Sequence, residues 1–213
     1  MKYTAFFAVS VVAASTTSAI AGCATTLDVG QAYISGLPTE KLTSKLTFPL
    51  IRVAVSQESN SSVLEPGITC TLTRNLDVSV SVMRGMKASA KWDVSFIGLS
   101  VAGHSIPPTN LFSINGEVKV DQEKLALIWH FGEDGLSSFF LLGAQHVSAH
   151  YRLWIPVDKY IVAEEGKKTG FAPYLGFGVA LWRDKSDSFT VKYEVYAVKP
   201  QAFSLTFGVR RAF

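Results

Sequence analysis

Hydrophobic residues recur at every second position along much of the chain, and short polar segments separate these alternating stretches. The clearest stretch is 202–213, where most odd positions are large and apolar: Phe203, Leu205, Phe207, Val209 and Phe213. The even positions of the same stretch are small or polar. Because successive side chains of a β-strand point to opposite faces, the pattern predicts a strand with one apolar face and one polar face.

Seven further stretches alternate in the same way. They cover residues 51–56, 68–73, 77–83, 124–131, 139–151, 171–182 and 189–198. Together with 202–213 they make eight predicted strands. Short polar turns are expected near 74–76, 132–136 and 183–187, and longer connections near 57–66, 87–122 and 150–170. The connection 87–122 also contains alternating apolar residues, so a ten-stranded arrangement is a second interpretation.

The composition indicates what surrounds these strands. Charged residues make up only 17% of the 213 residues, and the mean hydropathy is +0.24. Past residue 22, however, no apolar run reaches the roughly 18–20 residues that a membrane-spanning helix needs. The polar faces are mostly Gly, Ala, Ser and Thr, which suits a narrow barrel interior better than the wet face of a β-sandwich. We therefore predict an all-β fold, an eight-stranded antiparallel transmembrane β-barrel with an up-and-down meander topology.

Four short motifs resemble those of a known family. Phe213, preceded by apolar residues at alternate positions, resembles the assembly signal of bacterial outer-membrane barrels. Segment 173–179 (PYLGFGV) resembles a strand of the small barrels of the OmpA, OmpX and OmpW kind. Segments 73–76 (TRNL) and 104–109 (HSIPPT) resemble the OmpW family in particular. Over 48–213 this resemblance implies an outer-membrane barrel that passes small hydrophobic solutes, with an assembly signal formed by Phe207, Val209 and Phe213.

The N-terminus has the pattern of a secretory signal peptide. Lys2 provides a positive start, an apolar stretch follows, and 19–21 (AIA) is a small-x-small cleavage pattern. Segment 20–23 also resembles a lipobox, so lipidation of Cys23 is left open; the two cysteines are too few for a disulfide framework. We expect a signal peptide over 1–21, an N-terminal periplasmic segment over 22–45, and the barrel over 46–213 in the outer membrane of a Gram-negative bacterium.

Charged and histidine side chains on the polar faces are the candidate site residues. We expect seven of them to line the lumen: Arg52, Lys124, His146, His150, Lys192, Glu194 and Arg210. Unpaired charge in a narrow interior is costly, so acidic residues should balance the basic ones. His146 and Ser148 also place a base beside a hydroxyl on one strand, the minimum for an activated nucleophile. That pair resembles the His-x-Ser pair of a lipid A deacylase.

Three functions follow from these observations. The first is a passive channel of the OmpW kind for small hydrophobic molecules, and the second is a structural or adhesion barrel of the OmpX or OmpA kind. The third is a lipid A-modifying enzyme that uses His146 and Ser148. We expect no enzyme, cofactor or metal site. The expected partners are outer-membrane lipids and lipopolysaccharide, a small hydrophobic ligand, and the barrel-assembly machinery through Phe213. The formal net charge of +3 with no basic cluster along the sequence argues against nucleic acid.

Overall fold

The computed structural model describes residues 22–34, 49, 51–101, 104–133, 135–157, 160–182, 187–198 and 201–213. The predicted signal peptide lies outside these residues. Within them the chain forms eleven strands: β1 (Cys23–Ile34), β2 (Ile51–Glu58), β3 (Asn60–Thr73), β4 (Leu76–Phe96), β5 (Leu99–Val101), β6 (His104–Ile106), β7 (Thr109–Glu133), β8 (Leu136–Val157), β9 (Tyr160–Trp182), β10 (Asp187–Tyr196) and β11 (Ala202–Ala212). The described residues include no helix that is long and apolar enough to cross a membrane.

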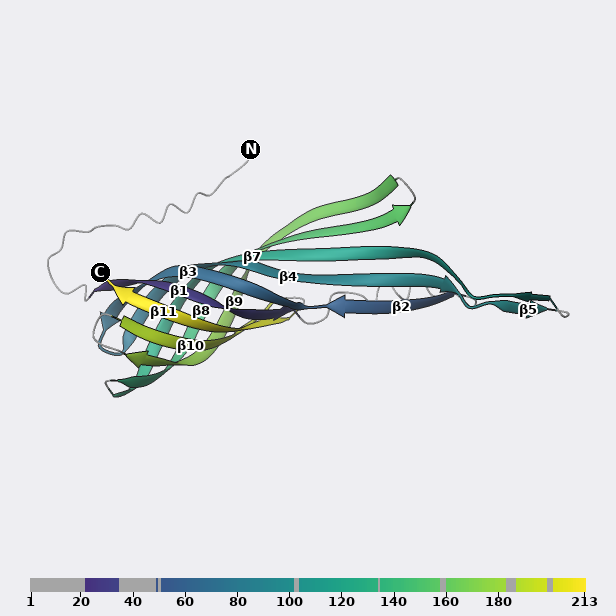
Figure 1. Cartoon of the computed structure of the whole chain (residues 1–213). Coiled ribbons are helices and arrows are strands. Elements are labelled where there is room, and N and C mark those ends of the chain that lie inside the picture. Colours follow the sequence, from purple (N-terminus) through teal and green to yellow (C-terminus); the bar gives the residue numbers. More distant parts are fainter. Residues whose placement is uncertain are drawn as a thin grey trace, which may run out of the picture.

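Eight of these strands close into a ring. Each strand pairs antiparallel with the next in the order β1, β3, β4, β7, β8, β9, β10, β11, and β11 pairs with β1. Figure 1 shows the resulting barrel, with both ends of the described chain at the rim that carries the short turns. The predicted eight-stranded antiparallel barrel is confirmed. We call this rim the short-turn end and the opposite rim the extended end.

The first barrel strand lies where the sequence predicted a segment outside the barrel. β1 pairs with β11 over its whole length and with β3 on its other side, so the prediction that 22–34 lies outside the barrel is wrong, and so is the barrel boundary at 46. The rest of the predicted periplasmic segment, 35–45, lies outside the described residues. A barrel avoids free edges only when its first and last strands meet. The alternating pattern that marks β1 in the sequence is short: Leu27 and Val29 face outward and Asp28 faces inward.

The segment around 51–56 is likewise not a separate barrel strand. β2 pairs with residues 89–96 of β4, while β3 pairs with residues 76–84 of the same strand. β2 and β3 therefore follow one another along β4, and β2 lies beyond the barrel. Alternation alone cannot distinguish these positions, because a strand that projects from a barrel has the same period as one in its wall.

Four strands are about twice as long as the wall requires. β4, β7, β8 and β9 have 21, 25, 22 and 23 residues, whereas β1, β10 and β11 have 12, 10 and 11. The long strands project from the extended end, and the β5–β6 hairpin lies at the far tip (Figure 1). The predicted long connections 87–122 and 150–170 are thus mostly strand. Their alternating residues belong to these extensions, so no ten-stranded barrel forms among the described residues.

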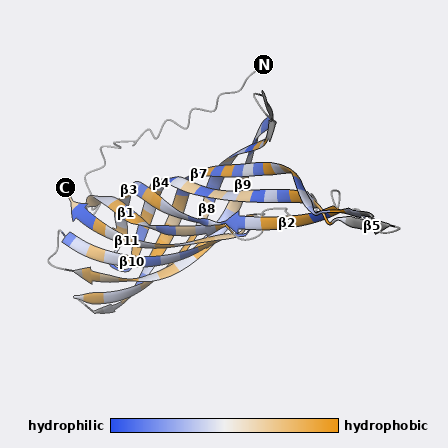
Figure 2. Cartoon of the chain, turned by 45° about the vertical axis from the view of Figure 1, so that its right-hand side comes forward, coloured by the Kyte–Doolittle hydropathy of each residue, from blue (hydrophilic) through white to orange (hydrophobic). Residues whose placement is uncertain are grey.

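The outer face of the barrel is an apolar belt. Hydrophobic residues alternate with others along the wall strands (Figure 2), and side chains such as Leu27, Leu125, Phe177 and Phe207 are about half exposed. On β9 the outward apolar residues run from Leu181 to Phe171. Ten residues at about 3.4 Å each, on a strand tilted by about 40°, give a height of about 26 Å. That height matches the apolar band of transmembrane barrels, which is about 25 Å.

A disulfide joins the first two wall strands at the short-turn end. Cys23 of β1 and Cys70 of β3 are directly paired residues, their Cα atoms lie 4.1 Å apart, and 47 positions separate them in the sequence. The bond uses the Cys23 sulfur that lipidation would require. Two cysteines were too few to predict a disulfide, because their proximity depends on the strand β1 that the sequence reading placed outside the barrel.

The disulfide should stabilise the barrel by restricting the unfolded chain. For a loop of this length, the entropy model gives about 4 kcal/mol. We expect the Cys23→Ser/Cys70→Ser variant to fold but to unfold at a lower urea concentration in detergent micelles, as followed by tryptophan fluorescence. Wild-type protein treated with reductant is the matched comparison and should shift equally. Identical midpoints for oxidised, reduced and variant chains would contradict this role.

Candidate functional site: the barrel interior and the extended sheet

A network of buried charges crosses the middle of the barrel. The Nζ atom of Lys124 on β7 lies 2.8 Å from Glu65 Oε1 on β3 and 2.6 Å from Glu194 Oε2 on β10. Lys192 on β10 lies 2.8 Å from Asp28 on β1 and 3.1 Å from Glu65. Four of the eight wall strands therefore meet through two ammonium groups and three carboxylates. In a dry interior such charges are tolerated because each has an opposite partner.

A second ionic group lies closer to the short-turn end. Asp77 of β4 accepts a hydrogen bond from Arg210 at 2.6 Å and lies 3.0 Å from Nε2 of His130 on β7. Arg210 also donates to the hydroxyl of Thr71 at 3.2 Å. A cavity of about 60 Å³ lies between this group and the central network. That volume holds a few water molecules and is too small for a solute passage.

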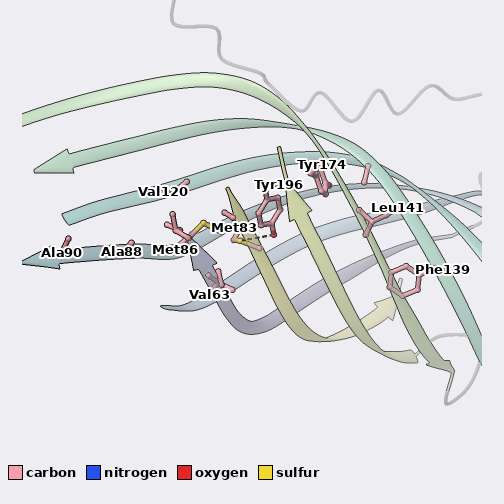
Figure 3. Packing of buried hydrophobic residues seen from close by; sticks show 14 of the residues in the cluster. Val63, Met83, Met86, Ala88, Ala90, Val120, Phe139, Leu141, Tyr174 and Tyr196 are labelled. Carbon is pink, nitrogen blue, oxygen red and sulfur yellow. Dashed lines mark hydrogen bonds between the residues drawn. The ribbon is translucent and has the colours of Figure 1, made fainter. Parts of the chain in front are cut away.

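The half of the interior toward the extended end is apolar. Met83 and Met86 of β4, Tyr174 of β9 and Tyr196 of β10 are packed together and almost fully buried (Figure 3). The hydroxyl of Tyr196 lies 2.8 Å from Glu194 and 2.6 Å from Ser204. Tyr196 thus connects the apolar cluster to the central charges, and side chains fill the lumen at both levels.

The motif at 173–179 accounts for part of this filling. Tyr174, Gly176 and Gly178 all face inward on β9. A Cβ atom at Gly178 would collide with the ring of Phe139, and one at Gly176 would crowd Leu141. The glycines therefore leave room for large side chains from β8, and Tyr174 occupies the space beyond them. In this chain the motif serves to pack a narrow interior.

The structure divides the seven predicted lumen residues into two groups. Lys124, Lys192, Glu194 and Arg210 lie inside the wall and belong to the ionic groups described above. Arg52 lies on β2 beyond the barrel and is exposed. The lumen prediction for His146 and His150 is also wrong, because both lie on the outward face of β8.

The register of β8 explains this error. Phe139, Leu141 and Gln145 are buried inside the barrel, whereas Phe140 and Leu142 are exposed on the belt. Segment 139–142 is Phe-Phe-Leu-Leu, so its alternation does not reveal which face is inward. A slip of one residue moves every side chain to the other face. His146 consequently packs on the outward ring of Phe171, with the ring centroids 5.0 Å apart.

The proposed nucleophile pair is not assembled on this outward face. Ser148 Oγ lies 3.4 Å from His150 Nε2, and His146 Nδ1 lies 3.4 Å from Glu123 Oε2. No hydrogen bond links His146 to Ser148 among the described residues. The Ser148–His150 and His146–Glu123 contacts are both long for a hydrogen bond and are exposed to solvent. The described residues also include no group of three or more His, Cys, Asp or Glu side chains placed to hold a metal ion.

The extended sheet has one apolar face and one charged face. On β4 and β7 the inner face carries Ala88, Ala90, Trp92 and Ile114, which pack as a continuation of the barrel's apolar cluster. The outer face carries charged residues, among them Asp93. The pKa of this carboxyl is lowered because the Ser113 hydroxyl, and then Lys91, hydrogen bond to the charged form. The sheet is therefore an amphipathic layer that continues four strands of the barrel wall.

Exposed apolar side chains reappear at the far tip of this sheet. Ile97, Ile106 and Leu111 are each about half exposed, and Phe112 is 38% exposed. The charged outer face separates this tip from the belt. We call these four residues the apolar tip. Single exposed apolar residues are ordinary on protein surfaces, but a cluster at the end of a projecting element is typical of a contact surface.

A second apolar feature lies on the wall where β10 ends. A pocket of about 500 Å³ is lined by Leu142 of β8, by Pro173, Tyr174 and Leu175 of β9, and by the chain from Val195 to Val198 with Gln201. β9 continues past this point without β10 beside it, apart from a hydrogen bond from the Ala197 amide to the Pro173 carbonyl. The pocket therefore opens sideways, and Tyr174 and Tyr196 separate it from the interior.

Several residues of the site were missed by the sequence reading. Asp28 lay in the segment assigned to the periplasm, and Glu65 lay in a predicted connection. His130 and Tyr196 were assigned to strands but not to the site. Their common signal is a polar residue on the strand face opposite the apolar one. The assembly-signal residues Phe207, Val209 and Phe213 are all exposed on the outside, and their role in assembly remains a prediction.

Comparisons with known proteins show a general likeness to small bacterial barrels. No family model and no curated protein sequence matches the chain. Among solved structures it is similar to the N-terminal β-barrel domain of Pseudomonas aeruginosa OprF, with 12% identity, a TM-score of 0.47, and coverage of 90% of this chain and 98% of that one. It is also similar to Neisserial surface protein A, with 12% identity, a TM-score of 0.48, and coverage of 92% of this chain and 100% of that one.

The attachment invasion locus protein Ail of Yersinia pestis, in complex with the heparin analogue sucrose octasulfate, is similar to the same degree. Its identity is 14% and its TM-score 0.47, with 90% of this chain and 99% of that one covered. The fold assignment itself rests on the closed ring of strand pairs. The architecture is that of an eight-stranded antiparallel β-barrel with an apolar outer belt.

Removing the central lysine should destabilise the barrel strongly. Lys124→Met would remove the ammonium group closest to Glu65 and Glu194 and leave both carboxylates to share Lys192 with Asp28, and breaking a buried pair costs about 3–5 kcal/mol. We expect a correspondingly lower urea midpoint in micelles. Lys119→Met, on the same strand but exposed, should change the unfolding free energy by less than about 1 kcal/mol. Equal effects of the two substitutions would show that the network does not hold the barrel together.

Proposed function

We propose that this chain is an outer-membrane barrel that presents its extended sheet outside the cell as an attachment surface. The observation that carries this proposal is the apolar tip, which lies far beyond the belt and is separated from it by charged residues. Lipid cannot cover the tip if it covers the belt. Exposed apolar surface at that distance is best explained by a partner macromolecule on the host or on a neighbouring cell.

The orientation follows from the lengths of the connections. Bacterial outer-membrane barrels have short turns on the periplasmic side and longer segments outside. Here the short turn at Arg74–Asn75 and the disulfide lie at one end, and the extensions lie at the other. We place the short-turn end in the periplasm, after export through a cleaved signal peptide and assembly through the C-terminal Phe213.

The filled lumen supports attachment over an axial pore. The central network and the apolar cluster occupy the cross-section at two successive levels, and their side chains are almost fully buried. Eight-stranded barrels have interiors just wide enough for their own side chains. The interior then serves as a rigid base, and the projecting strands are the part that can bind.

A passive channel of the OmpW kind is the second candidate. It is favoured by the sideways pocket of about 500 Å³ beside Tyr174 and Tyr196, which is large enough for a small hydrophobic molecule. A solute would enter at the extended end, pass the apolar cluster and leave into the membrane between β9 and β10. That route requires the two tyrosine rings to move aside.

We propose no catalytic function. On the outward face of β8 the His146–Ser148 pair would meet the headgroup region, where a lipid A-modifying enzyme would need it. However, Ser148 contacts His150, and the acidic partner Glu123 contacts the other histidine. A nucleophile, a base and an orienting acid in series are the requirement for this chemistry, and these side chains form two separate pairs.

Trimming the projecting strands tests the attachment proposal. One variant replaces residues 97–108 by a two-residue turn, which keeps the paired residues Phe96 and Thr109. A second removes residues 153–164 and keeps the pair Arg152 and Glu165. Cells of a non-adherent bacterial host that express the full chain should settle faster and adhere to an epithelial monolayer. The first variant removes Ile97 and Ile106, two of the four residues of the apolar tip, and should abolish most of that gain.

The same cells distinguish the two candidates. Surface display and heat-dependent migration on gels establish that each variant is folded. Unchanged adherence after both deletions would overturn the attachment proposal. If the cells instead take up a hydrophobic dye and a Tyr196→Ala substitution increases that uptake, the channel is the better account.

A further inference from the structure

Four basic side chains form a single row across the outer face of the extended sheet. Lys87 on β4 pairs with Lys119 on β7, Lys119 pairs with His150 on β8, and His150 pairs with Lys167 on β9. Directly paired residues of neighbouring strands point to the same face, and the strands are about 4.8 Å apart. The row therefore spans about 14 Å. We call it the basic row.

We call a set of directly paired residues across neighbouring strands a rung. The rungs on either side of the basic row differ from it, because their basic side chains form ion pairs with acidic side chains. On the side away from the belt, Arg152 lies 2.9 Å from Glu165. On the belt side, Arg84 lies 3.1 Å from Asp121. Opposite charges are thus paired across strands in both neighbouring rungs, whereas the basic row contains no acidic residue.

Like charges directly opposite each other on paired strands are destabilising. Within the row, Lys119 is partly balanced by Glu117 at 3.2 Å on its own strand. The side chains of Lys87 and Lys167 make no hydrogen bond or ion pair within the part of the chain that the structure describes. The fold therefore keeps two exposed ammonium groups and an imidazole in line at a cost, which an external anion would offset.

The height of the row above the belt indicates which anion. The belt ends at the rung of His146 and Phe171, and His150 lies four residues farther along β8. That is about 13 Å along the strand, or about 10 Å of height at a tilt of about 40°. Lysine side chains can bend from this height toward the headgroups while keeping their stems on the protein. The row thus lies at the level of lipid phosphates.

A hollow lies over the same place. It has a volume of about 460 Å³, and its lining includes Lys119, His150 and Lys167 as well as the neighbouring Glu117, Arg152 and Glu165. Basic side chains of three strands converge on it. A phosphate group in the hollow would accept charged hydrogen bonds from the row, which are stronger than those between neutral groups.

We propose that the basic row binds the phosphate groups of a phosphorylated glycolipid in the outer leaflet, with the lipid's acyl chains on the belt below. This inference rests on the proposed outer-membrane orientation. The row would fix the depth of the barrel and hold the sheet upright. The lipid phosphates would also take the place of the missing acidic partners of Lys87 and Lys167.

The test compares two charge-matched variants of the full mature chain. The row variant is Lys87→Gln/Lys119→Gln/Lys167→Gln. The control variant, Arg74→Gln/Lys91→Gln/Arg211→Gln, removes three exposed cations elsewhere. Each refolded protein is titrated in detergent micelles with bis-phosphorylated lipid A, with the same lipid stripped of phosphate, and with inorganic phosphate. Bound lipid is counted by native mass spectrometry.

We expect wild type and control to bind the bis-phosphorylated lipid alike. The row variant should bind at least about tenfold more weakly, because charged hydrogen bonds to phosphate are lost. Equal binding by the row variant and wild type, or equal binding of stripped and phosphorylated lipid, would overturn the proposal. Tight binding of inorganic phosphate without lipid would overturn the lipid assignment. Insertion of each chain into vesicles is measured separately, so that failure of the membrane placement is recognised on its own.

Discussion

The closure of the sheet between β1 and β11 is the constraint on which the rest of the structure depends. Once eight strands close, the interior is too narrow for a continuous water channel and must be filled by side chains whose charges balance. Lys124 and Lys192 satisfy this condition by reaching three carboxylates on three strands. The outer face has the opposite requirement and is apolar over the height of a membrane. Because side chains fill the lumen, the projecting sheet is the part of the fold that stays accessible.

Much of this fold was predictable because barrel strands repeat a period of two. Residues 171–182, 189–198 and 202–213 alternate clearly, and the structure places them as β9, β10 and β11 with large apolar residues outward. The eight-stranded antiparallel barrel followed from this pattern. β1 was missed because it carries few large apolar residues, and its identity as a strand depends on two partners far away in the sequence.

The site was less predictable, because register decides what each residue faces. Lys124, Lys192, Glu194 and Arg210 were recognisable as polar residues opposite an apolar face. His146 and His150 were not, since the neighbouring Phe-Phe-Leu-Leu segment is apolar on both faces. The basic row is the extreme case: its four members are separated by 32, 31 and 17 positions in the sequence, so only the strand pairing brings them together.

The most direct test of the account is the direction in which the side chains of β11 point. Single spin labels at positions 202 to 209 of the chain, reconstituted in vesicles, report their exposure to oxygen dissolved in the bilayer and to a water-soluble nickel reagent. We predict high oxygen exposure at 203, 205, 207 and 209, and low exposure to both reagents at 202, 204, 206 and 208. Strong exposure of positions 203, 205, 207 and 209 to the nickel reagent, or their burial from both reagents, would contradict the membrane barrel.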